Sequence, residues 1–169
     1  PTHIIACVGG GSNALGIFTE FLADTSIRLI GVDAGGVGSK AGQHACRFPH
    51  ASVGIMEGYK SYFLQDDDGN QGKTHSIAAG LDYLGIGPEL AELHDIKRVE
   101  FVSIKDEDAL AAVKTLATFE GIVPALESAH AVAYALKLSA TLGKNEVVVV
   151  NISGRGDKDL FALARNFDG

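Results

Sequence analysis

One stretch constrains the fold more than any other. Residues 4–18, IIACVGGGSNALGIF, pass from an apolar run into three glycines and then into a second apolar pattern. Residues 4–8 are typical of a strand buried on both faces, and residues 13–24 place apolar side chains at helical spacing. Residues 28–33, RLIGVD, are typical of a second buried strand. Strand, glycine turn, helix and strand within about thirty residues have the dimensions of a βαβ unit, which predicts a parallel sheet.

Later patterns extend this sheet. Residues 99–104 and 146–152 are typical of two more buried strands. The segment DDDGNQG predicts a hairpin turn, because it lacks the ligand spacing of a calcium loop. We therefore expect one α/β domain over residues 1–169, with a mostly parallel sheet flanked by helices on both faces.

Three further helices are expected between these strands. Pro88 is expected in the first turn of one helix, and Asp106 is expected to cap another. Ser128 is expected to open an Ala-rich helix that ends at Gly143. These helices supply the layers that a parallel sheet needs on its two faces.

Composition argues against two classes of partner. The net charge is −7 and Lys and Arg form no basic run, so nucleic acid is not expected. The apolar runs are too short for a membrane span, so we expect no membrane partner. No charged segment precedes a hydrophobic one as in a secretory signal, so we expect a cytoplasmic protein. Cys7 and Cys46 are expected to be buried thiols. Because Pro1 stands so close to the first strand, we expect the chain to be a piece of a longer protein.

Two turns are candidates for binding chemistry. Residues 9–13 follow the first strand, and residues 153–157 follow the last one. Ligands of parallel sheets bind where strands end and helices begin, so the two turns are expected near one edge. Glycines let backbone N–H groups approach a ligand, and a helix N-terminus favours an anion. A phosphate group is the natural occupant, although a tight turn with nothing bound has the same composition.

Several kinds of site fit the first turn. Residues 9–14 match G-x-G-x-x-A, and Asp33 ends the next strand where a Rossmann-like domain that binds NAD places its ribose acid. The nucleophile elbow G-x-S-x-G fits except at its last position, which is Ala14. A Walker A loop is excluded because no Gly-Lys-Ser/Thr follows. A non-catalytic module that binds a phosphate ligand stays open as well.

Four segments carry a family resemblance. In their order and spacing they resemble segments of the tryptophan synthase β-chain family, whose members are fold-type II pyridoxal-phosphate enzymes. The four segments are CVGGGSNALG, HSIAAGLDYLGIGPE, EGIVPALESAHA and VVVNISGRGDKD. The resemblance covers essentially the whole chain. It implies the C-terminal, cofactor-holding portion of a lyase of tryptophan biosynthesis, which condenses L-serine with indole to give L-tryptophan and water.

The resemblance also implies roles for single residues at the cofactor. Ser153 would meet the pyridine nitrogen, where a neutral hydroxyl moderates electron withdrawal by the ring. Glu127 would lie beside the ring as a catalytic acid. From the residues alone, Ser153 is more simply a helix cap and Glu127 a partner of the helix dipole. The residues implied to hold the phosphate are Gly9, Gly10, Gly11, Ser12 and Asn13.

Further implied roles lie outside the cofactor. Asp82 would help to orient the amino-acid substrate, although a turn former is the simpler interpretation. Met56 and Glu57 would line a tunnel for indole. Some members of the family carry two aromatic residues at these positions, so the acid Glu57 departs from that pattern. The backbone carbonyl groups implied to bind a monovalent cation, Na⁺ or K⁺, belong to Gly9, Tyr83 and Gly85.

The family's reaction needs two groups that these residues lack. No lysine here stands in the family's His-Lys-x-Asn context, and the acid that activates indole is missing as well. We therefore expect this piece to be inactive alone. The resemblance implies that the parent protein assembles with a tryptophan synthase α chain and a second β chain.

Overall fold

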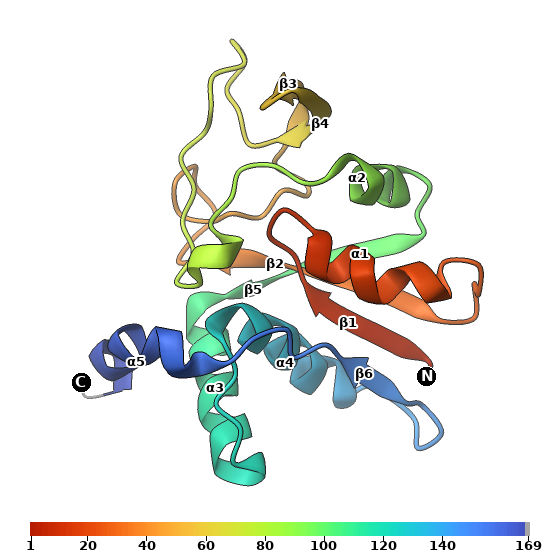
Figure 1. Ribbon diagram of the computed structural model, residues 1–169, viewed down its shortest axis with the longest axis vertical. Helices are drawn as coiled ribbons and strands as arrows, with labels where there is room; N and C mark the ends of the chain where they lie inside the picture. Colours follow the sequence, from red (N-terminus) through yellow and green to blue (C-terminus); the bar gives the residue numbers. More distant parts are fainter. Residues whose placement is uncertain (168–169) are drawn as a thin grey trace.

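The computed structural model describes residues 1–167 and is built on a four-stranded parallel sheet (Figure 1). Its strands lie in the order β5-β2-β1-β6, and every neighbouring pair is parallel. The α/β architecture expected from the sequence is therefore confirmed. The strands are β1 (His3–Cys7), β2 (Arg28–Gly36), β5 (Val99–Lys105) and β6 (Val148–Val150).

The central strand β1 determines where the two glycine-containing turns lie. All five of its residues are buried, and Ile5 pairs with Ile30 of β2 on one side and Val150 of β6 on the other. Because β1 and β6 are parallel neighbours, their carboxyl ends lie at the same edge of the sheet. The chain leaves β1 at residues 8–11 and leaves β6 at residues 151–155, so both turns begin at that edge.

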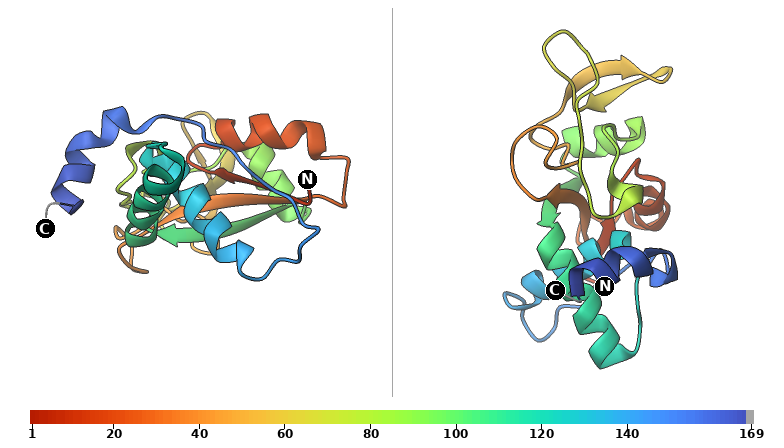
Figure 2. Two further views of the ribbon diagram at one scale, coloured as in Figure 1. Left: turned by 90° about the horizontal axis from the view of Figure 1, so that it is seen from below. Right: turned by 90° about the vertical axis from the view of Figure 1, so that its left-hand side faces the viewer.

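Helices cover both faces of the sheet, as Figure 2 shows in its left view. Alternate residues of β1 point to opposite faces. Ile4 packs in a core with α1 (Ser12–Phe18) and α2 (Pro88–Asp95), whereas Ile5 packs with α3 (Asp106–Glu120) and α4 (Leu126–Ser139). Each face of the sheet thus has its own apolar core.

The remaining elements extend from this centre. Strands β3 (Ser52–Met56) and β4 (Tyr59–Phe63) form a separate antiparallel hairpin at the top of Figure 1. The predicted turn at DDDGNQG is confirmed, since Gln65 and Gln71 pair across it. Short 3₁₀ segments and a last helix complete the described chain: η1 (Thr19–Phe21), η2 (Ala79–Leu81), η3 (Gly156–Asp159) and α5 (Leu160–Phe167).

Three predicted helix details need correction. Asp106 does not cap α3: it is the first helical residue, and its carboxylate lies 2.7 Å from His75 Nε2. The helix α4 runs from Leu126 to Ser139 rather than from Ser128 to Gly143. The predicted helix over residues 13–24 is shorter, because α1 gives way to 3₁₀ structure at Thr19.

Among residues 1–167, no helix combines the length and the apolar character that crossing a lipid bilayer requires. Cys7 and Cys46 are both buried free thiols, as expected.

Candidate functional site

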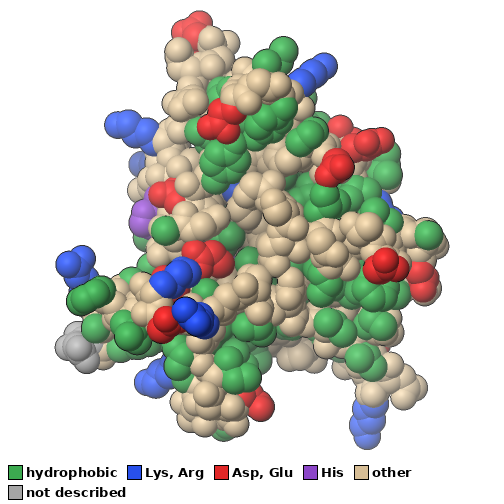
Figure 3. Space-filling model, in the orientation of Figure 1, with side chains coloured by type: hydrophobic (Ala, Val, Ile, Leu, Met, Phe, Trp, Pro, Cys, Tyr) green, Lys and Arg blue, Asp and Glu red, His purple; other side chains and the backbone are tan. Residues whose placement is uncertain are grey.

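The glycine turn, defined as residues 9–13, and Ser153 line one hollow of about 230 Å³, which we call the shared hollow. It lies at the carboxyl edge of the sheet, where Figure 1 shows the chain passing from β1 into α1. In Figure 3, the middle of the face that is shown is mostly tan, the colour of the backbone and of side chains that are neither hydrophobic nor charged nor His. The lining residues are Cys7, Gly9, Gly10, Gly11, Ser12, Asn13, Gly80, Leu81, Glu127 and Ser153.

Two of the three glycines in this turn are needed, for different reasons. A Cβ on Gly9 would lie 2.2 Å from the carbonyl oxygen of Gly80, which is closer than atoms can approach. Gly11 has a φ of 112°, a conformation that side chains rarely adopt. Gly10 is different, because its nearest neighbour would be the Tyr83 ring at 3.9 Å. The turn therefore presents bare backbone to the shared hollow.

The N–H groups of this turn are available to a ligand. The first N–H groups of a helix have no partner within it. Within residues 1–167, no backbone carbonyl accepts the N–H groups of residues 10–13. An acceptor in the shared hollow would therefore meet several donors at once, which suits an anion.

Asn13 ties this turn to the end of β6. Its amide nitrogen donates to the Cys7 carbonyl at 3.1 Å, and its amide oxygen accepts from Asn151 at 2.6 Å. Since Cys7 ends β1 and Asn151 follows β6, Asn13 fixes the two strand ends relative to each other. Ser12 is exposed at the start of α1.

Ser153 sits across the shared hollow with its hydroxyl hydrogen-bonded to a second hydroxyl. Its Oγ lies 3.1 Å from Ser128 Oγ and 3.7 Å from Cys7 Sγ. It does not cap the following helix, because the residue that precedes η3 is Arg155. Burial raises the pKa of Cys7, so the thiol that lies beside Ser153 is neutral.

Glu127 lies in the first turn of α4 and reaches across to η2. One carboxylate oxygen accepts the N–H of Gly80 at 2.8 Å, and the other lies 2.8 Å from the Lys158 ammonium. Burial alone would raise the pKa of Glu127, but the Lys158 and Gly80 contacts lower it below its usual value. Glu127 is therefore an anion at neutral pH.

Lys158 is held as an ammonium group. Burial would lower its pKa, but its contacts with Asp159 and Glu127 raise the pKa above the usual value. An amine must be deprotonated to act as a nucleophile. Lys158 is therefore suited to holding Glu127 and not to forming a covalent bond.

Three other predicted residues lie outside the lining of the shared hollow. Asp82 is exposed and follows η2 directly. Met56 ends β3, and Glu57 occupies the hairpin turn, where it accepts a 2.6 Å hydrogen bond from the Tyr83 hydroxyl. The Tyr59 hydroxyl lies 2.8 Å from the same Tyr83 oxygen. Glu57 is thus linked to Tyr83, whose ring lies next to Gly10 of the glycine turn.

The carbonyl groups of the expected cation site have a different partner. Gly9 and Tyr83 both accept hydrogen bonds from the Arg47 guanidinium, at 3.0 and 3.1 Å. Two of the three expected oxygens thus face a fixed positive charge, so the arrangement does not fit a metal cation. Sequence reasoning missed Arg47, because a lone arginine in the segment HACRFPH gives no pattern.

The dinucleotide alternative conflicts with the position of Asp33. Its carboxylate is fully buried and lies 2.6 Å from the Arg47 guanidinium. A ribose acid must be accessible to the ligand at the strand end. Asp33 cannot serve in that role here.

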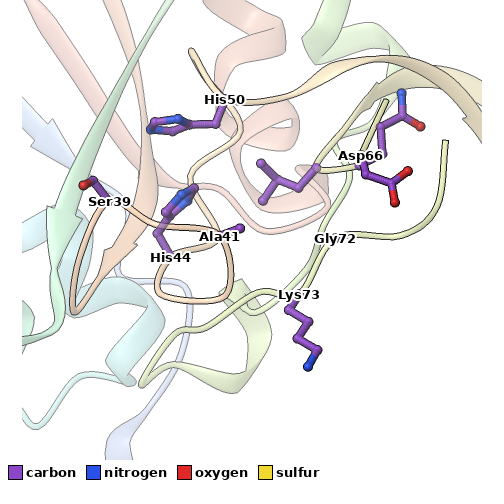
Figure 4. A pocket seen from close by; sticks show the side chains of 9 residues that line it. Ser39, Ala41, His44, His50, Asp66, Gly72 and Lys73 are labelled. Carbon is purple, nitrogen blue, oxygen red and sulfur yellow. The ribbon is translucent and has the colours of Figure 1, made fainter. Parts of the chain in front are cut away.

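A second hollow of about 280 Å³ lies beside the loop that follows β2 (Figure 4). His44 and His50 line it with ring centroids 4.5 Å apart, and Lys73 lies at its other side. Burial, and next the neighbouring His50, lower the pKa of His44. None of the residues that the sequence singled out as site residues lines this hollow.

Comparisons with known proteins identify the family of the chain. The family model described as "pyridoxal-phosphate dependent enzyme" matches residues 1–154. The tryptophan synthase beta chain of Helicobacter hepaticus (strain ATCC 51449 / 3B1) is 54% identical over 167 residues. That match covers 98% of this chain and 40% of the relative, so the chain spans well under half of its length.

A solved structure shows the same fold. The crystal structure of a mutant O-ureido-L-serine synthase with O-ureido-L-serine bound superimposes with a TM-score of 0.63 at 15% sequence identity. The superposition covers 98% of this chain and 43% of that chain. At this identity the likeness concerns the fold alone.

Proposed function

The chain belongs to the family of pyridoxal-phosphate dependent enzymes, and from that premise we propose that the shared hollow holds pyridoxal phosphate. One observation carries the proposal: the glycine turn and Ser153, at opposite ends of the chain, line the same hollow. The phosphate would lie against the N–H groups of residues 10–13, and the ring would lie toward Ser153.

The groups that line the shared hollow suit this cofactor. A phosphate is an anion that accepts several hydrogen bonds, and the turn offers several donors without a carbonyl partner among residues 1–167. The pyridine nitrogen is a single polar atom, and Ser153 offers a single neutral hydroxyl that Ser128 orients. The lining thus provides polar groups at the glycine turn and at Ser153, and the cofactor ring would lie between these two places.

The cofactor, when bound, supplies an electron sink that stabilises negative charge on the substrate. Ser153 would hold the ring without a carboxylate partner, which keeps the pyridine nitrogen from carrying a full charge. Glu127 would present its carboxylate at the edge of the shared hollow, where Gly80 and Lys158 fix its position. Asp82, exposed beside η2, would help to orient an amino-acid substrate.

We further propose that the chain forms the cofactor-holding part of a tryptophan synthase β chain. The 54% identity to such a chain supports L-serine and indole as substrates and L-tryptophan as product. Met56 and Glu57 would line the path of indole, and the parent protein would assemble with an α chain and a second β chain. The lysine that binds the cofactor would come from another part of the parent protein.

Thermal unfolding with different ligands tests the cofactor proposal. Pyridoxal phosphate should raise the unfolding temperature, whereas pyridoxal without its phosphate and NAD should have little effect. An increase with NAD alone would favour the dinucleotide alternative. Equal effects of pyridoxal and pyridoxal phosphate would contradict the assignment of the phosphate to the glycine turn.

A variant at Gly10 sharpens this test. A Cβ on Gly10 would meet no atom closer than 3.9 Å, so Gly10→Asp is suited to placing a carboxylate near the proposed phosphate position. It should weaken pyridoxal phosphate binding more than tenfold, because like charges repel. Gly10→Ser is the matched neutral control and should weaken binding far less.

The proposed reaction is tested separately. The full-length protein that contains this chain should form L-tryptophan from L-serine and indole when pyridoxal phosphate is present. Ser153→Ala in that protein should lower the rate and alter the absorbance of the bound cofactor. Binding of pyridoxal phosphate without any tryptophan formation would leave the cofactor site standing and contradict the substrates.

A further inference from the structure

Arg47 carries a positive charge in the interior of the protein. Its side chain is completely buried, which is rare for arginine unless the charge is paired. The guanidinium lies 2.6 Å from one carboxylate oxygen of Asp33, and the Arg47 backbone N–H donates to the other oxygen at 2.8 Å. The residue is thus fixed at the carboxyl end of β2.

The same guanidinium is surrounded by backbone carbonyl oxygens. Together with Asp33 they form a shell of oxygen atoms around one positive charge, as a hard metal cation would have. The planar guanidinium reaches all of them because its two terminal nitrogens donate in different directions. The carbonyl acceptors are Val8 at 2.6 Å, Gly9 at 3.0 Å, Ala45 at 2.7 Å and Tyr83 at 3.1 Å.

These carbonyl groups belong to the walls of the candidate site. Val8 and Gly9 lead from β1 into the glycine turn, and Gly9 lines the shared hollow itself. Tyr83 follows η2, and its ring lies next to Gly10. Arg47 therefore holds the start of the glycine turn and the segment after η2 in one arrangement.

A metal cation on the same oxygens would meet a fixed charge of its own sign. The carbonyl groups of Gly9 and Tyr83 both point at the guanidinium, and Asp33 already has a cationic partner. Repulsion between two neighbouring positive charges in a buried place is strong, because little water is present to screen it. The geometry thus favours one cation at this position, and Arg47 provides it.

We propose that Arg47 is a built-in cation that positions the glycine turn, so that this protein requires no Na⁺ or K⁺ at the carbonyl groups of Gly9 and Tyr83. The part that concerns cations depends only on the contacts of Arg47. The part that concerns pyridoxal phosphate rests on the proposed function, since a correctly placed turn is what the phosphate would bind.

The first test exchanges cations at constant ionic strength. The unfolding temperature of the wild-type protein should be the same in NaCl, KCl, CsCl and tetramethylammonium chloride. The dissociation constant of pyridoxal phosphate should vary less than twofold among them. A saturable rise of the unfolding temperature, or a fivefold gain in cofactor affinity, in one metal salt alone would overturn the proposal.

Two variants extend the test. Arg47→Ala leaves oxygen atoms and Asp33 around an empty space, so its stability should increase specifically with Na⁺ or K⁺ over tetramethylammonium. Arg47→Lys keeps a positive charge and should show no such response. If Arg47→Ala folds and its unfolding temperature is the same in every salt, the proposal is contradicted.

The outcomes separate the two proposals. Absence of pyridoxal phosphate binding in every salt would contradict the proposed function, while the unfolding temperatures would still decide the role of Arg47. If Arg47→Ala does not fold in any of the salts, the unfolding temperatures of the wild type and of Arg47→Lys in the four salts decide the role of Arg47.

Discussion

The carboxylate of Glu127 accepts the backbone N–H of Gly80 at 2.8 Å, which ties the first turn of α4 to η2 beside the shared hollow. A Cβ on Gly80 would lie 2.8 Å from the same carboxylate oxygen, so a side chain at this position would displace the carboxylate. Gly80 in turn packs against Gly9. The Glu127 carboxylate therefore supports the glycine turn indirectly, through the contact between Gly80 and Gly9.

Replacing Glu127 by Gln tests this support. The variant keeps an oxygen for the Gly80 N–H but loses the charge that pairs with Lys158. Because the folded pKa of Glu127 lies below its usual value of 4.5, its ionised form stabilises the protein above about that pH. That contribution is lost as the pH falls through the lower, folded pKa.

Urea unfolding between about pH 3 and pH 7 measures the effect. Glu127→Gln should be less stable than the wild type near neutral pH, and the difference should shrink at the acid end. Glu120→Gln, at the exposed end of α3, is the matched control. A difference that is constant over the whole range would contradict the role of the Glu127 charge.

Alanine at two glycines of the same segment should have opposite effects. Gly9→Ala forces a Cβ to 2.2 Å from the Gly80 carbonyl oxygen, and the overpacking should cost about 1–3 kcal/mol. Gly16→Ala lies in α1 with no atom within 4 Å of its Cβ, and should stabilise the protein by up to about 1 kcal/mol. Chemical denaturation of both variants checks this. Equal stabilities would mean that the turn tolerates a side chain at Gly9.

The Asp33 and Arg47 pair should behave as a coupled unit. Asp33→Asn leaves the guanidinium buried without its counter-charge, which should cost about 3–5 kcal/mol. Arg47→Met should cost a similar amount. The double variant should be less destabilised than the sum of the two, as a double-mutant cycle would measure. Additive effects would show that the two side chains act independently.

Both thiols should be protected from alkylation in the folded protein. Burial, and next the Asp33 charge, raise the pKa of Cys46 to about 11, and burial raises the pKa of Cys7. The thiolate is the reactive form, so iodoacetamide at about pH 8 should label neither residue quickly. Unfolding in urea should expose both. Rapid labelling of Cys46 in the native protein, detected by mass spectrometry, would contradict its burial.

The sheet could be predicted because its strands carry their own signal. The inner strands β1 and β2 are buried along nearly their whole length, as their apolar runs predict, whereas β5 and β6 form the edges of the sheet and are partly exposed. Gly9 is needed because backbone approaches backbone at that position. The parallel arrangement follows from these local patterns, but the strand ends do not, since β2 extends to Gly36 and β6 covers only Val148–Val150. The convergence of residues 9–13 with Ser153 then follows from the adjacency of β1 and β6.

Helix ends and buried charges could not be predicted in this way. Asp106 resembles a cap in the sequence, but its carboxylate binds His75 from a distant segment. The start of α4 is capped from afar too, since the Asp159 carboxylate accepts the Leu126 N–H at 2.9 Å. Arg47 has acceptors from four places in the chain, and only the folded structure brings them together.

A crystal structure of the protein soaked with pyridoxal phosphate would test the central claim most directly. Difference electron density should place the phosphate against the N–H groups of residues 10–13 and the pyridine nitrogen within hydrogen-bond distance of Ser153 Oγ. Density for the cofactor in the hollow beside His44 and His50, or none in the shared hollow at saturating concentration, would contradict it.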